Sequence, residues 1–293
     1  MSHFLMIGAG YSARAFARRV LADGHRLCGT TRTAEKAGRL RDIGIEPVLF
    51  DGSEISPDLD AELARATHLI VSAAPSEEGD PFLAALGTPA RDRMPDLRHI
   101  AYLSTVGVYG NHDGAWVTED SECRPRPGRS DHRLETEAQW RDAAAALGAP
   151  LAILRLSGIY GPGRNALVNL ANGSARRIIK PGQIFNRIHV DDIAGTLDHL
   201  CARTTGGVFN VTDDEPSPPQ DVIEFAAGLM GIEPPPAIDF ATADLSPMAR
   251  SFYGENKRVS NAKLKASGYS FAMPNFREAF AAMWRDDRWR SEA

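Results

Sequence analysis

The stretch HFLMIGAGYSA, residues 3–13, decides the fold of this chain. A mainly apolar run enters two glycines, and a helical pattern of small and apolar residues follows. This order is typical of the first strand, turn and helix of a Rossmann unit. Gly8 permits a tight turn, Gly10 lets the backbone approach a pyrophosphate, and the small Ala13 lets the helix pack on the strand. At Tyr11 and Ser12 the helix N-terminus adds free N–H groups, so the stretch predicts a phosphate-binding turn.

Outward from this turn, short apolar runs alternate with helical segments as far as residue 156. The alternation predicts an α/β fold with a doubly wound parallel Rossmann sheet, because parallel strands need helical crossovers. Helices are predicted at 12–24 and 130–148, each ending at a glycine. The predicted strands are 3–8, 25–30, 46–50, 68–73, 99–104 and 151–156.

Beyond residue 157 the pattern loosens, and proline clusters at 216–219 and 234–236 indicate loops. We expect residues 1–157 to form the dinucleotide-binding core and 158–293 a smaller, mixed α/β substrate lobe within a single compact unit. A strand at 207–214 and a helix at 219–231 are expected to return to the sheet. An amphipathic helix at 276–290 closes the chain.

The composition excludes several classes of function. A formal net charge of -5 and a pI near 5.9 give no basic surface for nucleic acid or an anionic membrane. No stretch reaches the ~20 apolar residues of a membrane span, and the N-terminus lacks the basic region of a signal peptide. The three cysteines form no CxxC pair, which fits a reduced, cytoplasmic protein.

The turn after the second predicted strand, Gly29-Thr30-Thr31-Arg32, indicates which dinucleotide is bound. A carboxylate at this turn would bind the ribose 2′-hydroxyl of NAD, whereas a basic residue accommodates the 2′-phosphate of NADP. Arg32 has the guanidinium fork suited to a phosphate, and Thr31 adds a hydroxyl. We therefore expect NADP in preference to NAD. Lys36 could bind the phosphate instead of Arg32. In that case Arg32 would be a solvated residue in the first turn of the helix that follows.

Two further turns are expected to line the cofactor. Asp51 follows the third strand and could accept a hydrogen bond from the adenine amine. Ala73, Ala74 and Pro75 follow the fourth strand. Each of these two turns can equally serve only to reverse the chain.

Five motifs in order, IGAGYSARAFA, LSTVGVYG, LRLSGIYGPGRN, RIHVDDIAG and VFNVTDDEP, cover nearly the whole chain. Together they resemble the extended and atypical short-chain dehydrogenases/reductases, in particular the NAD-dependent, nucleoside-diphosphate-sugar epimerase/dehydratase branch. The resemblance implies a seven-stranded Rossmann core and a Ser/Thr, Tyr and Lys set. In that set the tyrosine moves a proton, the lysine lowers its pKa, and the hydroxyl polarises the same substrate oxygen.

The resemblance assigns the hydroxyl role to Thr105, four residues before Tyr109. The usual YxxxK motif is missing. When this segment is aligned with the family, Arg129 stands at the position of the tyrosine and Arg133 at that of the lysine. Arg133 can supply positive charge near the ribose, but an arginine does not exchange protons as the usual acid or base does.

Three residues could replace the missing acid or base. Tyr109 or Tyr160 could supply a phenol from another direction, and His132 has an imidazole that titrates near neutrality. The alternative for Tyr109 is that it serves only in packing. The alternative for His132 is that it is an exposed residue of a helix.

Substrate contacts are predicted in the later motifs. Arg164 and Asn165 follow a Gly-Pro-Gly loop and could bind a phosphate or a sugar hydroxyl, and Arg187 could contact an anionic group. The loop can also act purely as a turn. No metal is expected, because the spacing of His and Asp matches no ligand motif.

We therefore expect an NADP-dependent oxidoreductase or epimerase acting on a small polar or nucleotide-sugar-like molecule. The alternative is a non-catalytic dinucleotide-binding sensor or regulatory protein, suggested by Arg129, and a third is a structural subunit with a decayed site. The expected partner is a small-molecule substrate. The alanine-rich helix 130–147 suits a homodimer interface or an ordinary buried face.

Overall fold

The computed structural model describes residues 1–87 and 90–290, which divide into two compact units. The first unit contains residues 1–108, 125–155 and 193–209, and the second contains 109–124, 156–192 and 210–293. The change of unit at Leu156 lies beside the boundary predicted at residue 157. Segments 109–124 and 193–209 cross that boundary, so the two units are interleaved in the sequence.

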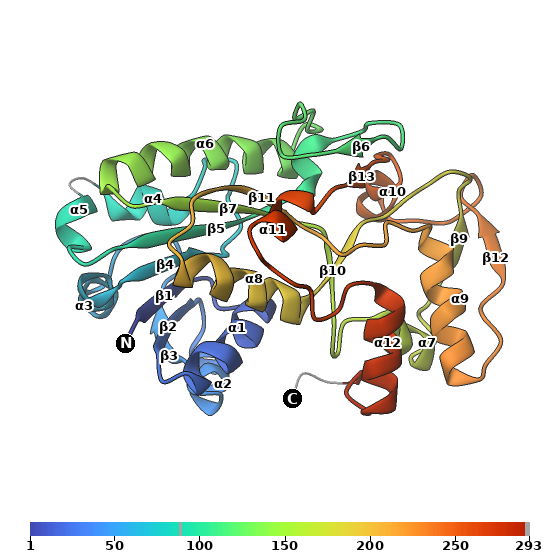
Figure 1. Cartoon of the computed structure of the whole chain (residues 1–293), viewed down its shortest axis with the longest axis horizontal. Helices are drawn as coiled ribbons and strands as arrows, with labels where there is room; N and C mark the ends of the chain where they lie inside the picture. The colour runs from blue at the N-terminus through green and yellow to red at the C-terminus, as the bar shows by residue number, and fades with distance from the viewer. Residues whose placement is uncertain (88–89, 291–293) are drawn as a thin grey trace. The chain divides into compact units, whose positions relative to one another are not determined.

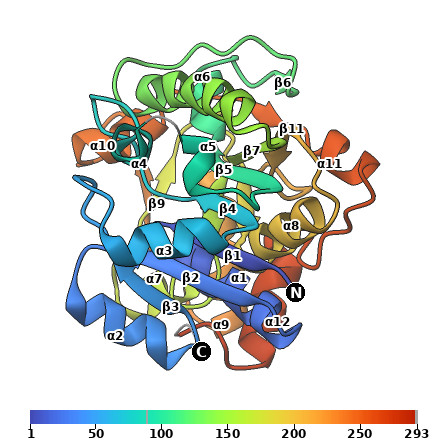
Figure 2. The ribbon, with the colours of Figure 1, turned by 90° about the vertical axis from the view of Figure 1, so that its left-hand side faces the viewer.

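A seven-stranded sheet is the frame of the fold among the described residues. Its order is β11-β7-β5-β4-β1-β2-β3, and the pairings from β3 through β2, β1 and β4 to β5 are parallel (Figure 2). The predicted doubly wound α/β sheet is confirmed, and each strand lies within two residues of its predicted ends except β11, which ends at Val211, three residues before its predicted end. The strands are β1 (His3–Ile7), β2 (Arg26–Thr31), β3 (Glu46–Leu49), β4 (His68–Val71), β5 (His99–Thr105), β7 (Leu151–Leu156) and β11 (Gly207–Val211).

Helices connect these strands (Figure 1). Their ends follow local chemistry: the side chains of Ser56 and Asp80 cap two of them, and the longest ends at left-handed Gly148. The helices are α1 (Tyr11–Ala22), α2 (Ala34–Asp42), α3 (Pro57–Arg65), α4 (Pro81–Leu86), α5 (Ala90–Arg93), α6 (Arg129–Leu147) and α8 (Val190–Ala202).

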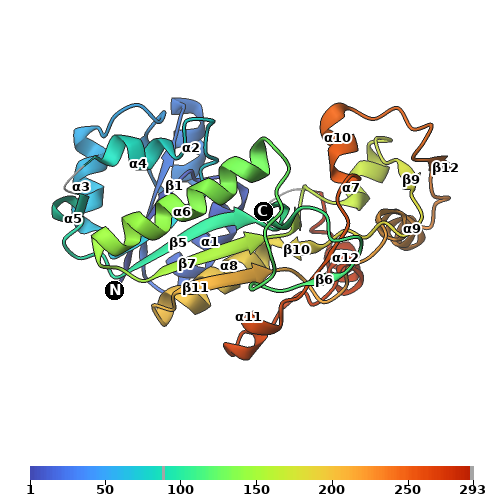
Figure 3. The ribbon, with the colours of Figure 1, turned by 90° about the horizontal axis from the view of Figure 1, so that it is seen from above.

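The core of the first unit lies on the sheet. Leu69, Val71 and Ile100 have no exposed surface, as expected for parallel strands covered on both faces. Trp140 of α6 stacks on Tyr102 of β5 with a centroid distance of 6.2 Å, and Figure 3 shows α6 running along β5. This packing fixes α6 beside the carboxyl end of β5.

The second unit is a set of short elements around its own apolar cluster, which includes Phe276 and Phe280. The helix predicted at 219–231 was expected to return to the main sheet, and this prediction is wrong. It packs against α7, α12 and β9, because its apolar face meets their side chains. The elements are η1 (Val106–Tyr109, at the junction of the units), β6 (Trp116–Val117), β8 (Gly158–Tyr160), α7 (Ala166–Ala171), β9 (Arg177–Ile179), β10 (Arg187–His189), α9 (Pro219–Met230), β12 (Ala237–Asp239), α10 (Pro247–Phe252), β13 (Arg258–Val259), α11 (Ala262–Ala266) and α12 (Phe276–Arg285).

A buried carboxylate ties the C-terminal segment of this unit together. Asp192 has no exposed surface and accepts hydrogen bonds from the Tyr269 hydroxyl and from the backbone N–H groups of Ala272 and Met273, at 2.7–2.9 Å. Its role is therefore structural. Within the described ranges, no helix is long and apolar enough to cross a membrane.

Candidate functional site

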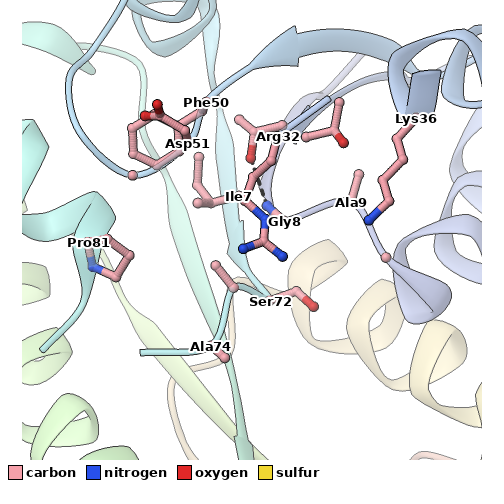
Figure 4. Close-up of a pocket in the computed structure, with 15 residues that line it drawn as sticks. Ile7, Gly8, Ala9, Arg32, Lys36, Phe50, Asp51, Ser72, Ala74 and Pro81 are labelled. Carbon is pink, nitrogen blue, oxygen red and sulfur yellow. Dashed lines mark hydrogen bonds between the residues drawn. The ribbon is translucent and has the colours of Figure 1, made fainter. Parts of the chain in front are cut away.

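A crevice of about 350 Å³ opens in the first unit at the carboxyl ends of β1, β2 and β4 (Figure 4). This edge of a parallel sheet, where the order of the strands reverses between β1 and β4, is where Rossmann folds bind ligands. Of the residues predicted to bind a cofactor, the crevice is lined by Gly8, Gly10, Thr31, Arg32, Asp51, Ala73 and Ala74.

The glycine turn has the geometry that its sequence predicts. Gly8 has a φ of +88°, and its N–H donates to the Thr30 hydroxyl at 2.8 Å. A Cβ at Gly8 would lie 2.8 Å from the backbone nitrogen of Ala73, which follows β4. The turn can therefore lie this close to Ala73 only because position 8 has no side chain. A Cβ at Gly10 would meet nothing within 4 Å, which leaves its backbone open to a ligand.

The N-terminus of α1 faces the same turn. Gly10 occupies the N-cap position and contributes no side-chain cap, so the first N–H groups of this helix are available to an anion. Ser12 and Ala13 are buried and pack the helix onto the sheet, and Tyr11 begins the helix. These three residues and Pro75 lie outside the set that lines the crevice. The fit to a diphosphate therefore rests on backbone groups.

Two cations lie at the crevice. Arg32 and Lys36 are exposed, and neither has an ion-pair partner within residues 1–87 and 90–290. Figure 4 shows the Arg32 guanidinium in front of Gly8, with Lys36 to one side. Lys36 lies in the first turn of α2, which the Thr33 hydroxyl caps. An anionic group at the end of β2 would meet two positive charges and the hydroxyl of Thr31.

Asp51 is a carboxylate with a defined orientation at the other side of the crevice. Its Oδ1 accepts from the Ser53 hydroxyl at 2.6 Å and from the Ser53 N–H at 3.0 Å. These hydrogen bonds lower the pKa of Asp51 below its usual value, so it is ionised at neutral pH. Asp51 and Phe50 lie on one side of Arg32 in Figure 4.

Sequence reasoning missed other residues that line the crevice, among them Ser72 and Pro81. Ser72 follows β4, and its position at the carboxyl end of an inner strand was the available signal. Pro81 begins α4, and nothing in its local sequence connects it to the glycine turn.

The residues aligned with the usual catalytic set lie at the end of β5 and the start of α6. Thr105 ends β5, and its Oγ1 accepts from the Gly107 N–H at 3.1 Å. Arg133 donates to the carbonyl oxygen of Leu103 at 2.6 Å, and its guanidinium lies 5.7 Å from the centre of the Tyr102 ring. The structure thus gives Arg133 partners on β5.

The two neighbouring candidates on α6 are less constrained. His132 is half-buried, and its backbone carbonyl accepts from the Thr136 hydroxyl. The side chain of Arg129 lies outside the described part of the chain. Neither His132 nor Arg133 lines the crevice.

Both alternative phenols lie in the second unit. Tyr109 has no exposed surface, and its hydroxyl donates to Asn210 Oδ1 at 2.7 Å. Tyr160 is also buried, and burial raises the pKa of its phenol well above the usual value. Burial therefore disfavours the ionised form of Tyr160, and Tyr109 is engaged in a structural hydrogen bond.

The predicted substrate residues also belong to the second unit. Arg164 is exposed, whereas Asn165 is buried and caps α7. The Asn165 side-chain amide donates to the carbonyl oxygens of Gly161 and Trp289, both at 2.8 Å. Arg187 donates to the Ser217 hydroxyl at 2.7 Å and packs over the Phe276 ring. Of the three, Arg164 alone keeps an exposed side chain.

A buried acid in this unit was not predicted from the sequence. Asp213 is 1% exposed, and burial raises the pKa of its carboxyl to about 8. Among the described residues, no group of three or more His, Cys, Asp or Glu side chains could hold a metal ion.

The sheet order, the glycine turn and the crevice together define an α/β Rossmann protein of the extended short-chain dehydrogenase/reductase superfamily, of the NAD-dependent epimerase/dehydratase type. A structure of a conserved protein of unknown function from Silicibacter pomeroyi is 46% identical, with a TM-score of 0.90 over 99% of this chain and 100% of that one. The chain belongs to the same family as this protein. No family model matches the sequence.

Three other proteins are similar over most of their length. A proposed NAD-dependent epimerase/dehydratase from Methylobacillus flagellatus is 28% identical, with a TM-score of 0.71 over 98% of this chain and 99% of that one. Protein YeeZ of Escherichia coli strain K12 is 26% identical over 80% of this chain and 86% of its own length. Human epimerase family protein SDR39U1, solved with NADPH, shares the fold at 18% identity, with a TM-score of 0.73 over 97% of this chain and 99% of that one.

Proposed function

We propose that this protein binds NADP(H) in the crevice of the first unit and is an oxidoreductase or epimerase acting on a small polar or nucleotide-sugar-like molecule. The observation that carries the proposal is the pair of cations beside the glycine turn, Arg32 and Lys36, which have no ion-pair partner in the part of the chain that the structure describes. A 2′-phosphate at the end of β2 would neutralise both charges. NAD has a hydroxyl at that position and gains little from them.

The residues of the crevice fit a dinucleotide at three points. The open backbone at Gly10 and the N-terminus of α1 suit the diphosphate. The ionised Asp51 suits the adenine amine as an acceptor. Two similar proteins carry names that agree with a nicotinamide dinucleotide, one as a proposed NAD-dependent epimerase/dehydratase and one as a structure with NADPH, so the NADP preference rests on Arg32 and Lys36 alone.

The proposal is tested by calorimetric titration of the purified protein with NADPH and with NADH. Arg32→Ala and Lys36→Ala should each weaken NADPH binding by about tenfold or more and leave NADH binding nearly unchanged, because each removes a charge-assisted contact to the phosphate. Arg39→Ala is the matched control, since this exposed arginine of α2 pairs with Glu35 and lies outside the crevice lining. Equal affinity for NADPH and NADH would contradict the NADP preference. Failure to bind either would contradict the proposal as a whole.

When bound, the dinucleotide would supply the redox chemistry. The residues of the chain would then have to position a substrate oxygen and handle its proton. Thr105 at the end of β5 is a hydroxyl suited to the first task. For the second, the tyrosine position of the family holds Arg129, so the acid or base must be His132, a phenol or water.

The second candidate function is a dinucleotide-binding sensor without catalysis. It is favoured by Arg133, which donates to the Leu103 carbonyl oxygen. Tight NADPH binding with no change in NADPH absorbance at 340 nm across a panel of aldehydes, ketones and nucleotide sugars would support the sensor. Turnover of any of them would support the enzyme.

Two further expectations accompany the proposal. We propose a cytoplasmic location, with Cys28 and Cys201 as buried, free thiols whose pKa values burial raises. A homodimer through α6 stays a prediction, tested by light scattering of the wild type and of Ala146→Glu on the exposed side of that helix.

A further inference from the structure

We propose that Ser130 acts together with Thr105 as a pair of hydroxyl donors that hold and polarise the oxygen of a carbonyl substrate. The pair would take over the polarising role of the tyrosine that is missing from position 129, and the proton would come from another group. This inference rests on the proposed function, because it assigns a substrate contact beside the same crevice.

The two hydroxyls lie close together on one side of Gly107. A Cβ at Gly107 would lie 2.7 Å from Ser130 Oγ and 3.3 Å from Thr105 Oγ1. Both oxygens therefore face the volume that a side chain at this position would fill. The glycine does not have a positive φ, so no backbone strain accounts for it there. Its lack of a side chain lets both hydroxyls approach the same side of this residue.

Both hydroxyls have a proton to donate. Thr105 Oγ1 accepts from the Gly107 N–H at 3.1 Å, which orients the oxygen and leaves its own proton for another acceptor. Ser130 is half-buried, and its hydroxyl carries a proton that it can donate. A carbonyl oxygen accepts two hydrogen bonds through its lone pairs, so one such oxygen satisfies both donors.

The fold places this pair at the edge of the sheet that carries the crevice. In the parallel register of β4 and β5, Val71 is opposite Tyr102, so the residues after Val71 and the end of β5 reach the same edge. Ala73 and Ala74, which follow β4, line the crevice. Thr105 ends β5, and α6 packs on β5 with Ser130 in its first turn.

The chemistry expected of this pair differs from that of a phenol. Aliphatic hydroxyls do not titrate in the physiological range, so Thr105 and Ser130 would polarise the oxygen through hydrogen bonds without giving up a proton. Hydrogen bonds that remain in place across pH predict a polarisation that is independent of pH. A protonated imidazole in the same place would instead polarise the oxygen in a pH-dependent way.

The test measures polarisation directly in the complex with NADP⁺, in which the oxidised dinucleotide cannot reduce a ketone. The probe is cyclohexanone labelled with ¹³C at the carbonyl, and the readout is its C=O stretching frequency by infrared difference spectroscopy. Wild-type protein should lower this frequency relative to water, equally from pH 6 to pH 9. Ser130→Ala and Thr105→Val should each reverse part of the shift, and the double variant should reverse most of it.

Gly107→Ala is the decisive second variant. Its methyl group would lie 2.7 Å from Ser130 Oγ and push that hydroxyl away, so the frequency shift should fall to the level of Ser130→Ala although the serine is still present. Ser174→Ala, the same chemical change at an exposed serine of the second unit, is the control and should leave the shift unchanged.

NADP⁺ binding is measured on every variant by calorimetry, which separates the two proposals. Normal NADP⁺ binding without a wild-type frequency shift, or with a shift that Ser130→Ala leaves intact, would overturn the hydroxyl pair and leave the proposed function standing. A shift that vanishes as the pH rises through 7 would assign the donor role to an imidazole and also overturn it. If the wild-type protein does not bind NADP⁺, the proposed function itself is refuted.

Discussion

Arg155 makes two hydrogen bonds to the carboxylate of Glu137, from Nε to Oε1 at 3.1 Å and from Nη2 to Oε2 at 2.8 Å. Both residues are buried, and Ser104 donates a third bond to Oε1 at 2.6 Å. Glu137 lies on α6, Ser104 on β5 and Arg155 on β7. The carboxylate thus joins this helix to two strands and fixes the direction in which the first turn of α6 presents Ser130.

Glu137→Ala should destabilise the protein by about 3–5 kcal/mol, because it removes the carboxylate that accepts two hydrogen bonds from the buried Arg155 guanidinium. Glu137→Gln keeps an acceptor for Ser104 and should cost less. Urea unfolding followed by far-ultraviolet circular dichroism gives both values. Glu135→Ala, an exposed acid on the same helix, is the control and should change stability by less than about 0.5 kcal/mol. A similar loss in Glu135→Ala and Glu137→Ala would contradict the role of the buried pair.

The parallel sheet was predictable because its strands are buried on both faces and appear in the sequence as continuous apolar runs. The glycine turn was predictable for a related reason. Gly8 has a positive φ and Gly10 leaves its backbone uncovered, and a glycine at either position shows directly in the sequence. Asn165 shows the limit of this reasoning. Its motif suggested a substrate contact, but one of its partners is the carbonyl of Trp289, far along the chain. Nothing in the sequence indicates such long-range hydrogen bonds.

Ser130 was missed for the same reason. In the family motif the tyrosine and lysine positions correspond to Arg129 and Arg133, and the position of Ser130 between them carries no motif residue. What singles out Ser130 is its approach to Gly107, 23 residues earlier, and this depends on how α6 packs on β5.

Gly8→Ala and Gly10→Ala should have different effects although the chemical change is the same. Gly8 has a φ of +88°, and its new Cβ would meet the Ala73 nitrogen at 2.8 Å, so the first variant should lose about 1–3 kcal/mol of stability and NADPH binding with it. At Gly10 the methyl group would point into open space. Gly10→Ala should therefore fold normally and lose only affinity for the dinucleotide.

Thermal unfolding and calorimetric titration of both glycine variants check this prediction. Equal melting temperatures would show that the close approach of Gly8 to Ala73 does not limit stability. Undiminished NADPH binding by Gly10→Ala would show that the diphosphate does not approach this backbone.

Asp213 should make the protein less stable as the pH rises. Burial raises the pKa of its carboxyl to about 8 in the folded state, whereas an aspartate in the unfolded chain has the ordinary pKa of 3.8. The unfolded state therefore releases the proton first. The contribution of this group to stability is complete below pH 3.8 and is lost as the pH rises towards 8.

Asp213→Asn removes this titration and keeps the shape of the side chain. Relative to the wild type, the variant should gain stability between pH 5 and pH 9, by about 1–3 kcal/mol, in urea unfolding. Asp120→Asn, an exposed acid in the same unit, is the control and should show no such trend. If the stabilities of the wild type and of Asp213→Asn differ by the same amount at pH 5 and at pH 9, this prediction is wrong.

The buried His68 should make the stability of the protein depend on pH in the opposite direction, and at lower pH. This residue begins β4 and is 6% exposed, and its ring lies 6.2 Å from that of His99 on the adjacent strand. Burial, with a further contribution from His99, lowers the pKa of His68 from 6.5 to about 4. Between these values the unfolded state binds the proton more tightly, so stability is complete above pH 6.5 and falls as the pH drops towards 4.

His68→Asn should flatten this acid limb, because the asparagine side chain does not titrate. The wild type should lose at most about 3 kcal/mol through His68 between pH 7 and pH 4, and the variant should lose correspondingly less over the same range. His112→Asn makes the same change on a loop of the second unit and serves as the control. Urea unfolding at half-unit steps of pH gives the three curves. If the His68→Asn curve ran parallel to that of the wild type, the acid sensitivity would have to come from other groups, such as the buried His99.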